Sequence, residues 1–288
     1  MANESTTTTL TELLPQIVAE AMFQAQERSI MRGLVKNFTM PLNSGKTITV
    51  PTYPKVTAAA VAEGTDLTNL SGGVDTAGPT LTVSEVGVMT TVTDLATRTS
   101  SSNVIADVGR LFGEAIATKI DKDLTALFDA FTGNVVGDGS TQITVNNVFE
   151  AVAKLRANGV PSSDLACVLH PMIAYDLKAA IGTQAYAGGD FQTEALRSGY
   201  VGTLAGVPIF ESSNMADASN NDPGTTGDYK GALFHRDALG LAMMQDIQIE
   251  QQRDASLRAT ELVATAVYGK GEIFDSYGIE MEFDSTIQ

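Results

Sequence analysis

Alternating polar and apolar positions predict two strand-like runs in the first third of the chain, at residues 46–54 and 80–94. Between them, residues 58–79 are rich in Ala, Gly, Thr and Ser and hold few large apolar side chains. This spacer is far too long for a two-residue hairpin turn, and it has too little apolar surface for a domain of its own. The ribbon cannot bury both of its faces within its own chain. We therefore expect it to rest on a neighbouring subunit, which favours an assembly protein over an enzyme.

Apolar residues spaced three and four positions apart predict two amphipathic helices in the first half of the chain. The pattern at residues 11–28 predicts a terminal helix that is either exchanged with a neighbour or docked on its own domain. The stronger pattern covers residues 103–131 and stops before Gly133. At about 1.5 Å per residue this helix would be roughly 40 Å long, which suits a structural spine. The spine positions selected from its stripe are Val108, Leu111, Phe112, Leu124 and Phe128.

The rest of the chain mixes strands and helices without regular alternation. We expect one helix to open at a capping box of Asn147 and Glu150, and another at Pro171, which suits the first helical position. After Lys230 short strands dominate. The strand patterns lie at residues 142–145, 165–170, 206–212, 231–235, 240–244, 262–269 and 278–284. This irregular order predicts an α+β fold.

Charge is sparse and strongly unbalanced along the chain. Charged residues make up 18% of it, below the roughly 25% typical of globular proteins, which suggests a surface covered in part by partners. The formal net charge is −16, and the densest basic stretch holds only Arg28, Arg32 and Lys36. Tight binding to nucleic acid without sequence preference needs larger Lys and Arg clusters. A container wall that must not adhere to packed DNA could use this acidity, as could many soluble proteins.

Few residues suited to catalysis occur in the sequence. It has one cysteine, Cys167, and two histidines, His170 and His235. Cys167 lies in an apolar run typical of a buried strand, and three strand positions place it on the opposite face from His170. The oxygen-bearing loop 214–229 lacks EF-hand spacing, and the glycines at 199–206 fit neither a dinucleotide fingerprint nor a P-loop. We therefore expect no catalytic residues, no metal and no cofactor.

Signatures of a membrane or secreted protein are also missing from the sequence. No run approaches the ~20 apolar residues of a membrane span. The first residues have neither the basic start nor the apolar core of a signal peptide. We expect no membrane partner, and synthesis in the cytoplasm.

Five local strings, taken in their order along the chain, carry a resemblance to a known family. They are residues 60–68, 88–94, 103–131, 168–177 and 204–212. In this order they resemble the E-loop tip, its return strand, the spine helix of the P domain, an A-domain passage from strand to helix, and the strand and turn that follow. The family is the major capsid protein of tailed double-stranded DNA bacteriophages, with the HK97 fold. The likeness covers nearly the whole chain, and the order of the strings carries it.

This resemblance implies an α+β, HK97-like capsid fold in five segments. They are an N-terminal arm at 1–40, an extended β-ribbon (E-loop) with flanking strands at 41–95, a P domain with the spine helix at 96–160, a mixed α/β A domain at 161–250, and terminal strands that return to the core at 251–288. The ribbon tip would contact a neighbouring subunit through Ala60, Glu63, Asp66, Leu67 and Leu70. Lys46 and Lys55 lie near the ribbon, but no motif supplies the partners for the isopeptide crosslink that some members form.

The implied function is that of a non-enzymatic major capsid protein. Its copies would assemble through pentamers and hexamers into an icosahedral viral head around double-stranded DNA, without sequence-specific DNA binding. The other implied partners are a separate scaffolding protein, a portal and decoration proteins, and the implied location is the virion capsid, assembled in the host cytoplasm. Two alternatives stay open. One is an encapsulin-type compartment with protein cargo; the other is a soluble hydrolase that uses Cys167 or a serine with His170 or His235.

Overall fold

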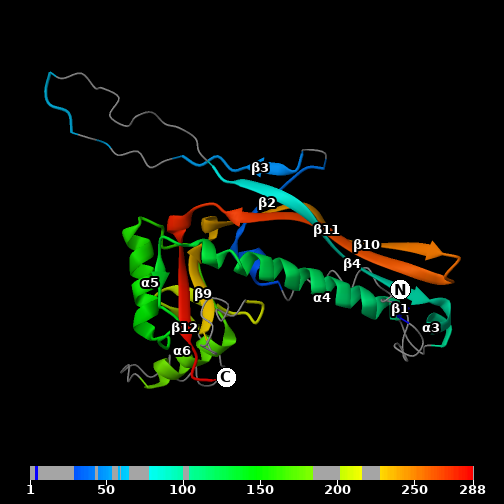
Figure 1. Ribbon diagram of the computed structural model, residues 1–288. Helices are drawn as coiled ribbons and strands as arrows, with labels where there is room; N and C mark the ends of the chain where they lie inside the picture. Colours follow the sequence, from blue (N-terminus) through cyan, green and yellow to red (C-terminus); the bar gives the residue numbers. More distant parts are fainter. Residues whose placement is uncertain are drawn as a thin grey trace.

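Two six-stranded sheets form the framework of the protein. The computed structural model describes residues 4–5, 29–42, 45–53, 58, 60–64, 78–99, 104–183, 202–215 and 228–287. Figure 1 shows an elongated first sheet with a long helix along one face, and a more compact block around the second sheet at one end. The helix expected at residues 11–28 lies outside the described residues.

Three long antiparallel strands are the centre of the first sheet. They are β4 (Thr80–Thr93), β11 (Ala259–Glu272) and β10 (Leu239–Asp254), in that spatial order. Short strands flank them. β1 (Glu4–Ser5) and β3 (Thr47–Thr49) pair with β4, while β2 (Lys36–Thr39), which follows helix α2 (Met31–Leu34), pairs with β10.

β10 and β11 are much longer than the sequence patterns indicated. Residues 250–253 of β10 are all exposed, so they carry no apolar alternation for a pattern to register. Their ladder with β11, which continues to Asp254 opposite Ala259, supplies the hydrogen bonds instead. The expectation that short strands dominate after Lys230 is therefore wrong, whereas β4 confirms the strand expected at 80–94.

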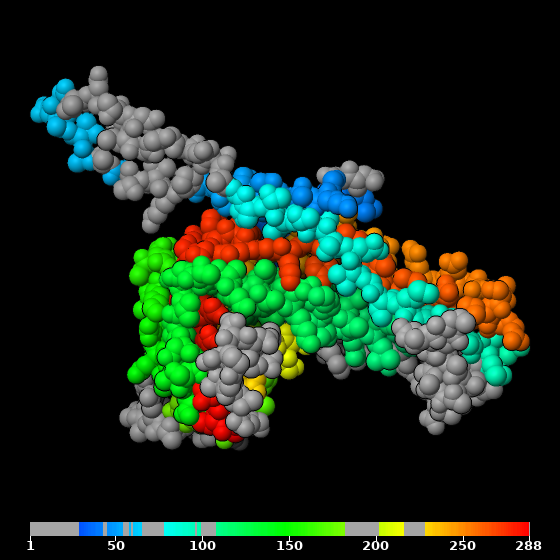
Figure 2. Space-filling view, viewed as in Figure 1, coloured from blue at the N-terminus to red at the C-terminus, as the bar shows by residue number. Residues whose placement is uncertain are grey.

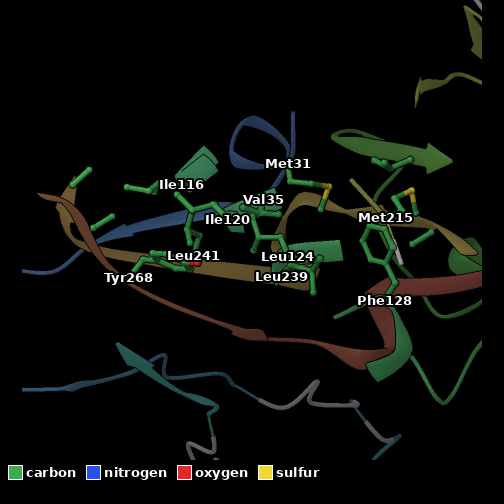
Figure 3. Packing of buried hydrophobic residues seen from close by; sticks show 14 of the residues in the cluster. Met31, Val35, Ile116, Ile120, Leu124, Phe128, Met215, Leu239, Leu241 and Tyr268 are labelled. Atoms are coloured by element: carbon green, nitrogen blue, oxygen red, sulfur yellow. The ribbon is translucent and has the colours of Figure 1, made fainter. Parts of the chain in front are cut away.

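Helix α4 (Val104–Thr125) lies along the first sheet and fills the first core. Its large buried apolar residues recur every four positions, at Val108, Phe112, Ile116, Ile120 and Leu124. Figure 3 shows the last three of these packed among residues of the sheet. Leu111 belongs to the predicted stripe but is 61% exposed, because about 100° of helical rotation separates it from its neighbour Phe112.

The spine helix ends earlier than the predicted boundary at Phe131. After Thr125 a turn leads into the 3₁₀ helix η1 (Phe128–Ala130), so Phe128 lies outside the spine helix. The Thr125 hydroxyl donates to the Asn214 carbonyl at 3.0 Å and also contacts a carbonyl of its own last turn, a competition that disfavours continued helix. The turn places the Phe128 ring 5.6 Å from that of Phe234 in the core.

The second sheet has the order β5-β12-β9-β6-β8-β7 and carries the second core. Its strands are β5 (Val135–Val136), β6 (Leu165–Leu169), β7 (Thr203–Leu204), β8 (Val207–Glu211), β9 (Asp228–His235) and β12 (Gly278–Asp284). Helices α5 (Val145–Ala157) and α6 (Pro171–Thr183) complete the block. The strands expected at 165–170, 206–212, 231–235 and 278–284, and the helix that opens at Pro171, are confirmed.

Two local expectations in this block are wrong. Residues 142–145 form no strand, and Gln142 makes only an isolated bridge to Asp284. Helix α5 is capped by Thr144, with Asn147 at its third position accepting the Thr144 N–H at 2.9 Å. Asn is an unusual partner in a capping box, where Glu or Gln is typical, so the sequence pattern pointed to the wrong cap.

The five expected segments are distributed over both cores. Helix α5, from the segment 96–160, packs in the second core, whereas β10, largely from 161–250, lies in the first sheet. The division into five segments stays a prediction. Within the described part of the chain, no helix combines the length and the apolar character needed to span a membrane.

Two leucines of α4 give a matched test of this packing. Leu124 is fully buried and Leu111 is 61% exposed. We expect Leu124→Ala to lower the free energy of unfolding by about 3 kcal/mol, because it leaves a cavity under the sheet. Leu111→Ala should stay within about 0.5 kcal/mol of the unsubstituted protein. Urea unfolding of the purified subunits measures both, and equal losses would contradict the placement of α4.

Candidate functional site

A β-ribbon that leaves the first sheet at β3 and β4 is the most prominent surface feature. Figure 2 shows the blue residues around 60 far from the body of the molecule. Residues 58 and 60–64 are all exposed. Of the predicted contact residues, Ala60 and Glu63 are therefore exposed in the single chain. The other three, Asp66, Leu67 and Leu70, lie outside the described residues.

β4 changes its pairing partner at the base of this ribbon. Val83 lies opposite Gly269 of β11, whereas the preceding Thr82 lies opposite Thr47 of β3. Gly269 permits the crossing, because a Cβ there would stand 2.7 Å from the Thr82 carbonyl oxygen. A small third core beneath this point buries Met40, Leu81, Val83 and Ala242. The ribbon thus starts from a packed base.

The two sides of the ribbon are held together just beyond this base. The Val50 N–H donates to the Pro79 carbonyl at 3.0 Å. Gly78 also lies against Val50, and a Cβ at position 78 would stand 1.8 Å from the Val50 carbonyl oxygen. Only glycine fits there without displacing backbone. This requirement was not identified from the sequence, because it depends on a contact between distant parts of the chain.

Large apolar side chains are exposed around the ribbon. Tyr53 is 69% exposed, Leu42 is 67% and Val61 is 43%. Sequence reasoning did not select these three residues. A bulky apolar residue within a polar stretch rich in Gly, Pro and Thr is the signal that could have identified them. Each of these apolar side chains is left in water by the single chain.

An ion pair braces the opposite end of the first sheet. Arg253 of β10 donates two hydrogen bonds, of 2.5 and 2.6 Å, to Asp94 at the start of helix α3 (Asp94–Thr99). The hydrogen bond from Arg253 lowers the pKa of Asp94. Leu95 and Leu257 beside this brace are 61% and 45% exposed. Both are large apolar side chains exposed at the end of the sheet that lies far from the ribbon tip.

Asp123 joins the spine helix to β11. Its carboxylate accepts the Tyr268 hydroxyl at 2.7 Å and pairs with Lys119 at 2.8 Å and Lys270 at 3.0 Å. Burial acts to raise the pKa of Asp123, but the hydrogen bonds from Lys119, Tyr268 and Lys270 outweigh it and hold the pKa below its usual value. The charged carboxylate therefore stabilises the contact between helix and sheet.

The residues weighed for hydrolysis are engaged in structural contacts. Cys167 is fully buried, and burial raises its pKa to about 12, which suppresses the thiolate that would act as nucleophile. The His170 ring stacks on Tyr229 at 4.2 Å, and His235 accepts the Asp237 N–H at 3.1 Å. Among the residues that the structure describes, no group of three or more His, Cys, Asp and Glu is placed to hold a metal ion.

One hollow, of about 330 Å³, adjoins His235. It is lined by Lys36, Asn37, Asp164, His235, Arg236 and Asp237. Lys36 pairs with Asp237 at 2.8 Å, which joins β2 to the 3₁₀ helix η3 (Arg236–Ala238). No serine or cysteine lines this hollow, so it offers no nucleophile of the kind that a hydrolase uses.

Comparison with protein families gives one extensive match. A family model described as phage capsid protein matches residues 75–279. The matched range runs from just before β4 to the start of β12, so it includes the spine helix and most of both sheets. A search of curated proteins found no match.

Solved structures share the fold at low sequence identity. The capsid structure of cyanophage P-SCSP1u is 18% identical, with a TM-score of 0.70 over 90% of this chain and 89% of that one. The structure from Mycobacterium phage Che8 is 20% identical, with a TM-score of 0.69 over 88% and 90%. A virus-like particle from Pyrococcus furiosus is 10% identical, with a TM-score of 0.58 over 91% and 96%. These likenesses confirm the predicted α+β, HK97-like fold.

The close approach at the ribbon base can be tested with one methyl group. Gly78→Ala should separate the two sides of the ribbon and speed hydrogen exchange of the Val50 amide by at least about tenfold, the equivalent of 1.4 kcal/mol. Gly33→Ala is the matched control, because nothing lies within 4 Å of a Cβ at that position. Exchange followed by mass spectrometry measures both, and unchanged protection in Gly78→Ala would rule out the close contact.

The lowered pKa of Asp123 predicts a pH effect with a definite sign. Because the folded-state pKa lies below the usual 3.8, the stabilisation is complete above that value and is lost as the pH falls through the folded-state pKa. Asp123→Asn should lower stability at neutral pH and lose less on acidification than the unsubstituted protein. Urea unfolding at several pH values measures this, and identical pH slopes for the two proteins would contradict it.

Proposed function

This chain belongs to the phage capsid protein family and is a major capsid protein, and we propose that its copies assemble through pentamers and hexamers into an icosahedral head that encloses double-stranded DNA. The single observation that carries the assembly proposal is the projecting ribbon, with a packed base and an exposed outer part. Apolar side chains on such a ribbon leave water only when another molecule covers them.

A neighbouring copy is the partner that fits the ribbon best. Its predicted tip residues Ala60, Glu63, Asp66, Leu67 and Leu70 would lie on that copy. Contacts of a standard size, about 1,600 Å² or less, are individually modest but sum to a stable shell when the assembly closes. A tip without bulky core residues could rest in different poses on pentamer and hexamer neighbours.

The N-terminal arm at 1–40 is proposed as a second contact element. β1 adds to the outer edge of β4, with Glu4 opposite Thr91. A short strand at the end of a terminal segment can add to the same edge of its own chain or of a neighbour, since the ladder hydrogen bonds are equivalent. Exchange of this arm between copies would strengthen the shell.

Charge and family support the remaining proposed partners. The net charge of −16 disfavours tight binding to phosphate, which suits a wall around DNA without sequence-specific contacts. We place the protein in the virion capsid after assembly in the host cytoplasm. A separate scaffolding protein, a portal and decoration proteins are the partners that a head of this kind would use.

We propose a structural role without catalysis. The burial of Cys167 and the structural contacts of His170 and His235 support this role over hydrolysis. An encapsulin-type compartment is less well supported, because the matching family model is that of phage capsids.

Removing the outer ribbon tests the assembly proposal. A variant in which a short Gly-Ser linker replaces residues 54–77 keeps every residue of the three described cores. It should stay folded but lower the yield of closed shells at least tenfold, which corresponds to about 1.4 kcal/mol of lost contact energy. Light scattering and electron microscopy measure the yield.

Two controls complete this experiment. Circular dichroism and urea unfolding establish that the variant is folded, and Leu111→Ala provides a spine-surface variant with the ribbon intact. Shells formed at normal yield by the shortened variant would overturn the role of the ribbon. A full-length chain that stays monomeric over wide ranges of concentration and salt would overturn self-assembly itself.

A further inference from the structure

Asp121 is a fully buried carboxylate near the C-terminal end of the spine helix. It lies two residues before Asp123 but faces a different part of the molecule, where three chain segments meet. These are α4 itself, the start of the chain segment 29–36, and the turn 212–215 that follows β8. Among the residues that the structure describes, the hydrogen-bond donors given for Asp121 include no lysine or arginine, unlike those of Asp123.

The first set of contacts holds residues 29–31, at the start of the segment 29–36. The Ser29 hydroxyl donates to one Asp121 oxygen at 2.9 Å and the Ile30 N–H donates to the other at 3.2 Å. The Met31 N–H also hydrogen-bonds to this carboxylate. Figure 3 shows Met31 and Val35 on the same side of the core as Ile120 and Leu124.

The second set of contacts fixes the turn 212–215. The Asn214 side chain hydrogen-bonds to Asp121, and the Asn214 carbonyl accepts the Thr125 hydroxyl one helical turn further on. The turn starts on the second sheet, where the Ser212 N–H donates to the Leu169 carbonyl at 3.1 Å. It ends in the first core, where Met215 is buried.

Burial makes these hydrogen bonds interdependent. Desolvation raises the pKa of Asp121, and the hydrogen bonds from Ser29, Ile30, Asn214 and Met31 act against it. A buried carboxylate that loses part of its donor set carries a large penalty. No hydrogen bond or ion pair within the described chain joins 29–36 directly to 212–215. The carboxylate is thus their shared polar contact.

We propose that Asp121 couples the root of the N-terminal arm to the block around the second sheet. When a neighbouring copy displaces the chain before Ser29, the Asp121 carboxylate loses hydrogen bonds from residues 29–31. Its hydrogen bond with the Asn214 side chain then changes in strength. Binding of the arm on one subunit then alters the position or order of the turn 212–215 in that subunit. This coupling between subunits rests on the proposed contact role of the arm. The hydrogen bonds of Asp121 themselves lie within the single chain.

Hydrogen exchange on the unassembled subunit tests the coupling without requiring shells. Asp121→Asn keeps the size of the side chain but removes the charge and one acceptor. We expect exchange in both 29–36 and 212–215 to speed up at least about tenfold, because hydrogen bonds to charged groups contribute that much. Residues 145–169 of the second block should keep their protection, which distinguishes local loosening from global unfolding.

Two single-sided controls separate coupling from simple loss of contacts. Arg32→Gln breaks the ion pair with Asp246, 3.0 Å long, and should loosen 29–36 alone. Thr125→Val removes the hydroxyl that holds the Asn214 carbonyl and should loosen 212–215 alone. Asp121→Asn should differ from each control because it speeds hydrogen exchange in both segments.

Ser29→Ala decides the question if Asp121→Asn fails to fold. Ser29 donates only on the side of the arm, so coupling predicts faster exchange in 212–215 as well. Exchange confined to 29–36 in Ser29→Ala, or to one segment in Asp121→Asn, would overturn the proposal. This experiment does not measure shells. A failure of assembly would therefore contradict the proposed function but not the coupling found by hydrogen exchange.

Discussion

The packing of the spine helix on the first sheet is the constraint on which the other features depend. Val108, Phe112, Ile116, Ile120 and Leu124 form one row on α4. The facing positions of β11 alternate in register, and two of them, Ala264 and Ala266, are small enough for the helix to lie close. Because this contact fixes α4 against three long strands, it also fixes both ends of the sheet, where the ribbon and the Arg253–Asp94 brace lie.

Two carboxylates on the spine helix have pKa values shifted in opposite directions because they face different surroundings. Asp123 faces β11, where Lys119, Lys270 and Tyr268 outweigh the effect of burial and lower its pKa. Asp121, two residues earlier, faces neutral donors, and burial raises its pKa. The first therefore acts as a charged tie between helix and sheet. The second is a buried polar joint whose stability depends on keeping all of its donors.

The architecture suits a subunit of a larger assembly. Its cores are complete within the described chain, yet the ribbon, the edge of α3 and the turn between β10 and β11 expose large apolar side chains. In the shell that we propose, these surfaces would be contacts between neighbouring copies. The base of the ribbon is already ordered in the single chain. Binding to a neighbour therefore loses little free energy in ordering this part of the ribbon.

The sequence by itself determined the elements whose apolar pattern repeats locally. The spine helix, the strand at 80–94, the buried strand at 165–169 and the order of segments that indicates the capsid fold are all of this kind. Tertiary structure decided the features that depend on contacts between distant residues. The end of α4 at Thr125, the need for Gly78 and the contacts of Asp121 are examples. Each depends on a partner far away in the chain, and a local pattern carries no information about such a partner.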